Sequence, residues 1–133
     1  MDAETHLRIN HAGSRILLAE DNAINREVIV ALLSSVALAA DTAKDGVEAV
    51  EKINENAYDL VLMDVQMPGM DGLEAKSEVR GMVEHTDLPI LAMTANVFTE
   101  VSQACLDVGM NDCIGKPAEP ANLFAAIDKW LPE

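Results

Sequence analysis

The sequence has few aromatic and few basic residues. Aromatic side chains make up 3% of its 133 residues, so a buried core must be built mainly from aliphatic side chains. Lysine and arginine together number 9 against 23 aspartate and glutamate residues, which gives a formal net charge of −14. Unaided binding to nucleic acid or to anionic lipid is therefore disfavoured, because both depend on basic side chains. The acidic balance instead favours a basic partner surface or a divalent cation.

The sequence also lacks a hydrophobic run long enough to span a bilayer, and its first residues lack the apolar centre of a secretory signal. Its only cysteines, Cys105 and Cys113, do not have the spacing of metal ligands. We expect both to be reduced, buried thiols in a reducing compartment. The chain is long enough for one domain with its own core, and we expect it to be cytoplasmic, without direct membrane contact.

Short apolar runs alternate with helical patterns from residue 15 onward. Strands are expected at residues 15–20, 38–43, 59–64, 89–94 and 111–114. Helices are expected at residues 23–36, 46–55, 72–83, 97–108 and 119–131. Continuous apolar strands separated by helices predict an α/β fold in which a parallel sheet carries helices on both faces. Residues 1–14 show mixed charge and little periodicity, and we expect a linker or disordered tail there, followed by one domain over 15–133.

The first predicted helix has an apolar stripe. Ile24, Val28, Leu32 and Val36 recur on one helical face. A stripe of this kind predicts the face that packs on the sheet. Asp21 or Asn22 can cap the start of the helix.

Three apolar runs end on polar residues suited to phosphate or metal chemistry. The first run is followed by Glu20 and Asp21, and the third predicted strand ends on Asp64. Because ligands bind at the carboxyl ends of strands in open α/β sheets, these acids are expected to meet at one edge. Three carboxylates repel one another unless a cation lies between them, and Mg²⁺ accepts such ligands. The ordinary alternative is that they are solvated loop acids.

Further residues at the same edge add to this pattern. The loop after Asp64 is rich in proline and glycine, and we expect it to hold the backbone carbonyl of Gln66 near the metal. Thr94 ends the fourth strand and can donate a hydrogen bond to an anionic oxygen, although such a threonine is usually a helix cap or a simple β-former. Lys116 is the only lysine or arginine between residues 81 and 128, and it can bind a phosphoryl oxygen or form a surface ion pair. The three histidines, His6, His11 and His85, are scattered in the first residues and in a loop, and no catalytic role is assigned to them.

Together these residues resemble the receiver domain of two-component response regulators. The resemblance covers about residues 15–132. Its motifs are Glu20-Asp21-Asn22, Asp64 with Met67-Pro68-Gly69-Met70-Asp71-Gly72, Thr94-Ala95 and Lys116-Pro117. The resemblance implies a flavodoxin-like (βα)5 three-layer sandwich with strand order 2-1-3-4-5. This order belongs to the known receiver fold and does not follow from the residue pattern itself.

The resemblance also implies a role for each site residue. Asp64 would accept a phosphoryl group from a phosphohistidine and later release it by hydrolysis, so the domain is partly an enzyme. Mg²⁺ would be held by Glu20, Asp21, Asp64 and the backbone carbonyl of Gln66. Thr94 and Lys116 would bind the phosphoryl oxygens. Neutralising charge and positioning the reactants are what phosphoryl transfer requires of a protein.

Three longer phrases point to a sub-family, the receivers of hybrid sensor histidine kinases. The phrases are Glu20-Asp21-Asn22-Ala23-Ile24-Asn25, Met63-Asp64-Val65-Gln66-Met67-Pro68 and Ala92-Met93-Thr94-Ala95-Asn96. The expected partner is a histidine kinase or a histidine phosphotransfer domain, and the isolated domain is expected to be a monomer. A parent sensor kinase could tether it to the inner membrane.

The sequence departs from the family at two positions, and alternatives stay open. Cys113 stands where many receivers have an aromatic residue, which puts the aromatic switch in doubt. Ala37 lies near the place where a glycine often follows the first helix. The chain could also be a free-standing response regulator or a receiver-shaped binding module that no longer takes phosphate. A Mg²⁺-dependent phosphohydrolase is disfavoured, because Val65-Gln66 offers no second acid and the chain is too short for a cap.

Overall fold

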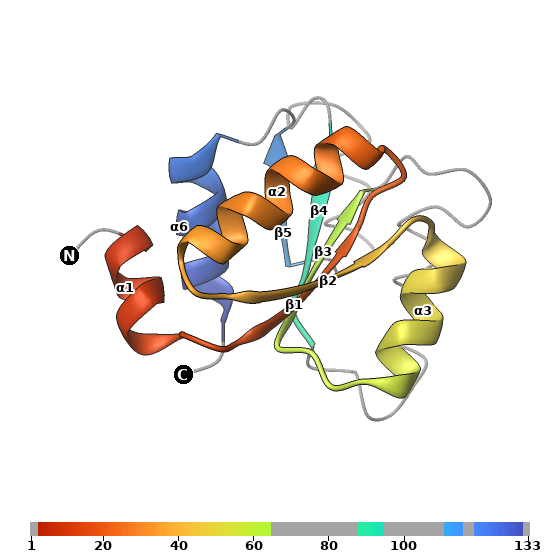
Figure 1. The fold of residues 1–133 in the computed structure, drawn as a ribbon, viewed down its shortest axis with the longest axis horizontal. Helices are drawn as coiled ribbons and strands as arrows, with labels where there is room; N and C mark the ends of the chain where they lie inside the picture. Colours follow the sequence, from red (N-terminus) through yellow and green to blue (C-terminus); the bar gives the residue numbers. More distant parts are fainter. Residues whose placement is uncertain (1–2, 65–87, 95–110, 116–118, 132–133) are drawn as a thin grey trace.

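The computed structural model describes residues 3–64, 88–94, 111–115 and 119–131. They form a parallel sheet with strand order β2-β1-β3-β4-β5 (Figure 1). The strands are β1 (Arg15–Ala19), β2 (Ala39–Ala43), β3 (Leu60–Asp64), β4 (Ile90–Thr94) and β5 (Asp112–Gly115). The flavodoxin-like order implied by the resemblance is confirmed.

Helices cover both faces of this sheet. Those described are α1 (Ala3–Asn10), α2 (Ala23–Ser35), α3 (Gly46–Glu55) and α6 (Pro120–Trp130). Figure 1 shows α2 and α6 on one face and α3 on the other. The helices predicted at residues 72–83 and 97–108 lie outside the described residues. Within the described ranges, no helix is both long enough and apolar enough to cross a membrane.

The core lies in two layers, one on each side of the sheet. Ile16 and Leu18 of β1 pack in the cluster that contains α1, α2 and α6. Leu17 and Ala19 of the same strand pack in the cluster that contains α3. Because both faces of the central strands are buried, these strands carry runs of consecutive apolar residues instead of alternating ones. The continuous runs were therefore a correct signal for a sheet inside three layers.

The buried face of α2 differs from the predicted stripe. Ile24 is 72% exposed and Val28 is 53% exposed, whereas Ile29 and Leu33 are buried against the sheet. Val36, the last member of the predicted stripe, is buried. The helix is apolar on more than one side, so periodicity alone did not decide which side packs on the sheet. The prediction that Ile24 and Val28 face the core was wrong.

The turn after α2 explains the position of Ala37. The backbone N–H of Ala37 donates to Ser34 at 3.1 Å, and that of Leu38 donates to Leu33 at 3.1 Å. These two bonds close the helix as a Schellman motif, which places the residue after the cap in the left-handed region. Ala37 accordingly has a φ of 63°. Glycine would adopt this conformation without the steric cost that an alanine carries.

The first residues of the chain also differ from expectation. Residues 1–14 were predicted to be a linker or disordered tail, but Ala3–Asn10 form helix α1, which packs beside α6 (Figure 1). Leu7 is fully buried in the core layer of α2 and α6. A helix this short with one buried apolar side chain gives no periodic hydrophobic signal in the sequence. The boundary of the domain at residue 15 stays a prediction.

Candidate acidic site at the carboxyl edge of the sheet

The carboxyl ends of β1 and β3 bring acidic residues side by side. Ala19 of β1 is in register with Met63 of β3, so Glu20 and Asp64 lie one residue further along at the same edge. Asp21 follows directly. Each of the three acids offers a carboxylate oxygen, and these oxygens all lie within 4.8 Å of one another. The structure therefore gathers the three acids that the sequence predicted to meet.

Burial strengthens the repulsion between the carboxylates of this cluster. Glu20 and Asp64 are each 1% exposed, whereas Asp21 is exposed. At 4.8 Å, two like unit charges repel by about 3.5 kcal/mol at an effective dielectric constant of ~20, and by about 1 kcal/mol in bulk water. A divalent cation among the carboxylates would reverse the sign of this energy. Carboxylate oxygens are hard ligands, so the donor set fits Mg²⁺.

The first turn of α2 holds Glu20 in place. The backbone N–H of Asn22 donates to Glu20 Oε1 at 3.2 Å, and Arg26 Nη1 donates to the backbone oxygen of Glu20 at 2.7 Å. The side chain of Asn22 caps α2 by accepting from the backbone N–H of Asn25 at 3.0 Å. Of the two capping residues that the sequence allowed, Asn22 is thus the one used, which leaves the Asp21 carboxylate available to the acidic cluster.

β4 and β5 lead toward the same edge. Asp64 is in register with the residue before Thr94, and Thr94 is in register with Gly115. The backbone of Thr94 therefore ends β4 next to the acids, but its side chain lies outside the described part of the chain. Gln66 and Lys116 also lie outside it. The roles expected for these three residues stay predictions, as does the effect of Cys113, whose side chain is not among those described.

A second group of potential ligands was missed by sequence reasoning. His6, His11 and Asp128 offer ligand atoms within 4.8 Å of one another, from α1, the turn after it, and α6. The histidines are five residues apart and the aspartate is over a hundred residues away, so no local spacing marks the group. Only the docking of α1 on α6 could have revealed it.

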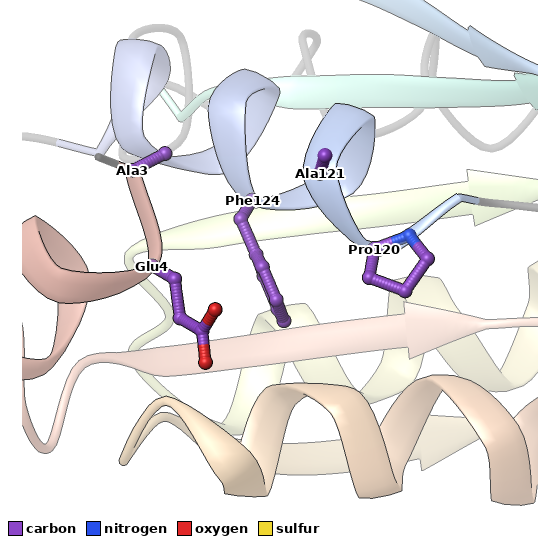
Figure 2. Close-up of a pocket in the computed structure, with 5 residues that line it drawn as sticks. All are labelled: Ala3, Glu4, Pro120, Ala121 and Phe124. Carbon is purple, nitrogen blue, oxygen red and sulfur yellow. The ribbon is translucent and has the colours of Figure 1, made fainter.

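A pocket of about 320 Å³ lies where the first turns of α1 and α6 meet (Figure 2). It is lined by Ala3, Glu4, Pro120, Ala121 and Phe124. Figure 2 shows the Phe124 ring extending from α6 between Glu4 and Pro120. The carboxylate of Glu4 is already bound by Arg8 Nη2 at 2.8 Å. A mostly apolar hollow with one paired carboxylate lacks the converging polar groups of a reactive site.

Comparison with known proteins adds to this geometry. The family profile described as the response regulator receiver domain matches residues 16–128. Hybrid signal transduction histidine kinase B of Dictyostelium discoideum is 40% identical over 126 residues, which cover 86% of this chain and 6% of that protein. The chain thus spans a small part of this much longer relative.

Two solved structures are similar over most of their length. The receiver domain of sensor histidine kinase PA1611 from Pseudomonas aeruginosa, with a magnesium ion coordinated in its active site cleft, is 39% identical. Its TM-score is 0.84, with 90% of this chain and 98% of that chain covered. The Saccharomyces cerevisiae Ssk1 receiver domain, crystallised with the histidine phosphotransfer protein Ypd1, is 28% identical, with a TM-score of 0.82. That alignment covers 90% of this chain and 89% of the other.

Proposed function

The chain belongs to the response regulator receiver family, and we propose that it is the receiver of a hybrid sensor histidine kinase that takes a phosphoryl group from phosphohistidine onto Asp64. The observation that carries the proposal is the gathering of a buried Asp64 with Glu20 and Asp21 at the carboxyl edge of the sheet. The hybrid kinase origin is supported by the similarity to the Dictyostelium hybrid kinase. Mg²⁺ as cofactor is supported by the three-carboxylate donor set and by the magnesium in the Pseudomonas receiver.

The proposed reaction exchanges one bond to phosphorus for another. An oxygen of the Asp64 carboxylate bonds to phosphorus while the bond from phosphorus to the partner's histidine nitrogen breaks, which leaves an acyl phosphate and a free imidazole. Water later attacks the acyl phosphate, releases inorganic phosphate and restores the carboxylate. The domain is therefore a phosphoryl acceptor that also dephosphorylates itself.

The surrounding residues provide charge and orientation. Glu20, Asp21 and Asp64, with the backbone carbonyl of Gln66, would hold Mg²⁺, which when bound supplies positive charge beside the phosphoryl oxygens. In this proposal the Thr94 hydroxyl donates to one phosphoryl oxygen. The Lys116 ammonium pairs with another as a point charge.

The exposed apolar face of α2, which was predicted to pack on the sheet, is suited to contact a partner protein. Ile24 lies in the first turn of α2, next to the acidic edge, and Val28 lies one turn further along, both with exposed side chains. A partner that delivers a histidine to Asp64 must approach this edge. We place its apolar contact on Ile24 and Val28; the partner is a histidine kinase or a histidine phosphotransfer domain, as in the yeast complex.

Direct labelling tests the acceptor. The chain is incubated with Mg²⁺ and acetyl phosphate, and its intact mass is measured. One phosphoryl group should be added to the native chain and none to Asp64→Asn, whereas Glu51→Gln, an exposed acid on α3, should label as the native chain does. Absence of label on the native chain would refute the acceptor role and leave a phosphate-independent binding module. Turnover of phosphate esters would favour a phosphohydrolase.

Transfer from a protein donor tests the docking surface. The double variant Ile24→Ser/Val28→Ser should label normally with acetyl phosphate but slowly with a phosphorylated histidine phosphotransfer domain. The matched control is Val47→Ser, since Val47 is 45% exposed on α3 at the opposite face of the sheet. Equal slowing by both donors would mean that the double variant damages the site itself, and no slowing would remove Ile24 and Val28 from the interface.

A further inference from the structure

Helix α1 and helix α6 bring two imidazoles and a carboxylate together. His6 lies on α1, His11 lies just after it, and Asp128 lies near the end of α6. His6 Nδ1 is hydrogen-bonded to Asp128 Oδ1, and the two imidazole rings are 5.5 Å apart in an edge-to-face arrangement. One ligand atom from each of the three residues lies within 4.8 Å of the other two.

His11 has a buried nitrogen without a hydrogen-bond partner. Its side chain is 4% exposed, and its Nε2 lies 3.9 Å from Asp128 Oδ1, which is too long for a hydrogen bond. The backbone fixes the residue on both sides, because its N–H donates to Leu7 and its carbonyl accepts from Ser14, each at 3.0 Å. An unsatisfied buried nitrogen is unfavourable, and the Asp128 carboxylate lies beside it. The arrangement leaves Nε2 available to bind something placed among the three residues.

We propose that His6, His11 and Asp128 bind a zinc ion, which fastens α1 to α6. Two imidazole nitrogens and one carboxylate form a ligand set suited to Zn²⁺, with a fourth position for water. Mg²⁺ prefers oxygen ligands, so we expect Mg²⁺ at the three carboxylates and Zn²⁺ at the two histidines and Asp128. Tetrahedral Zn²⁺ with bonds of about 2.0–2.1 Å separates its ligand atoms by roughly 3.3 Å. Because no two of the three ligand atoms are more than 4.8 Å apart, no pair has to close by more than about 1.5 Å.

That closure is within reach of side-chain rotation. The side chains of His6 and Asp128 are 31% and 24% exposed, so both can turn while the buried His11 stays fixed. The hydrogen bond between His6 and Asp128 is given up when both bind the metal. The resulting link joins the segment before β1 to the last helix of the domain.

The zinc site is separate from the acidic site. His11 precedes the first residue of β1 by four positions, whereas Glu20 follows its last residue. The five residues of β1 lie between them and span roughly 16 Å, so the two groups lie at opposite ends of this strand. Loss of phosphorylation would therefore say nothing about zinc, and loss of zinc binding would say nothing about Asp64.

Calorimetric titration tests the proposal. The full chain is freed of metal with a chelator, saturated with Mg²⁺ and titrated with ZnCl₂, and Co²⁺ is added in parallel as a spectroscopic probe. We expect one equivalent of Zn²⁺, a rise in melting temperature, and visible absorption of tetrahedral Co²⁺. His6→Gln should lower the affinity for Zn²⁺ by more than about tenfold, because loss of a residue that merely hydrogen-bonds to a metal ligand already lowers metal affinity by about 10–100-fold.

Three variants keep the test decisive. His85→Gln removes the remaining histidine and should bind Zn²⁺ like the native chain. Asp64→Asn should also bind normally, and a loss there would move the zinc to the acidic site and overturn the proposal. His6→Gln is checked for folding by circular dichroism without metal. If the native chain binds no Zn²⁺, or if folded His6→Gln binds it equally well, the three residues are only a hydrogen-bonded contact between α1 and α6.

Discussion

Replacing Asp21 by asparagine should stabilise the metal-free chain. The Asp21 carboxylate lies within 4.8 Å of those of Glu20 and Asp64. Because Asp21 is exposed, the solvent-screened value of about 1 kcal/mol applies to each of the two repulsions. Its position just before α2 contributes a favourable ~0.3–1 kcal/mol with the helix dipole, which the substitution loses. The net expectation is a gain of about 1 kcal/mol in the free energy of unfolding.

Magnesium should reverse this order of stability. A metal that binds only the folded state stabilises it by about 2.7 kcal/mol at one hundred times its dissociation constant. The native chain gains this energy, and Asp21→Asn gains little because it has lost a ligand. The variant should thus be about 1 kcal/mol more stable than the native chain in chelator, and about 1.7 kcal/mol less stable at that magnesium concentration.

Urea unfolding at low ionic strength measures both values, with linear extrapolation to water and an unchanged slope as the check on two-state behaviour. Glu51→Gln should track the native chain under both conditions. In 1 M NaCl the advantage of the metal-free variant should shrink, because the screening length falls to about 3 Å. A variant that is destabilised in chelator, or one that magnesium stabilises as much as the native chain, would refute the reasoning.

Three further predictions concern the scaffold. Burial, followed by the hydrogen bond to Asp41, raises the pKa of Tyr58 to about 12. Because the phenol titrates at about 10 in the unfolded chain, the free energy of unfolding should decline as the pH rises from about 10 to about 12. Tyr58 is the only tyrosine, so phenolate absorbance reports its titration directly. An unchanged titration midpoint in Asp41→Asn would exclude Asp41 as a cause of the raised pKa. Ala37→Gly should raise the free energy of unfolding by about 0.5–1 kcal/mol, because glycine relieves the positive φ; a loss in urea unfolding would argue against strain there. Leu7→Ala should cost about 2 kcal/mol in the same assay, against little for Ile9→Ala, which is 63% exposed; equal effects would mean that α1 does not dock.

The sheet and the acidic site were predictable for the same reason. Parallel strands buried on both faces must be apolar throughout, so the runs that end at Ala19 and Asp64 were visible without any structure. Because such strands point the same way, the residues that follow them meet at one edge. Strand direction alone placed Glu20 and Asp64 at the same edge of the sheet. That their strands are neighbours, which brings the two acids side by side, came from the family resemblance.

The face of α2 and the docking of α1 depend on tertiary contacts that periodicity does not report. α2 carries apolar residues on two sides, and Ile29 packs in the core cluster with residues from other elements, whereas Ile24 is exposed. The contacts of α1 include the buried Leu7, the hydrogen bond between His6 and Asp128, and the hydrogen bond from Arg8 Nε to the backbone oxygen of Ser35. Residues far apart in the chain decide both cases, so the sequence alone could not.

The central claim is that Asp64 carries the phosphoryl group, and chemical mapping tests it most directly. Borohydride reduces an aspartyl phosphate to homoserine, which peptide mass spectrometry can locate. After phosphorylation with Mg²⁺ and acetyl phosphate, homoserine should appear at position 64 and should be absent when Mg²⁺ is chelated. Homoserine at another carboxylate, or none on a chain that has bound Mg²⁺, would contradict the account.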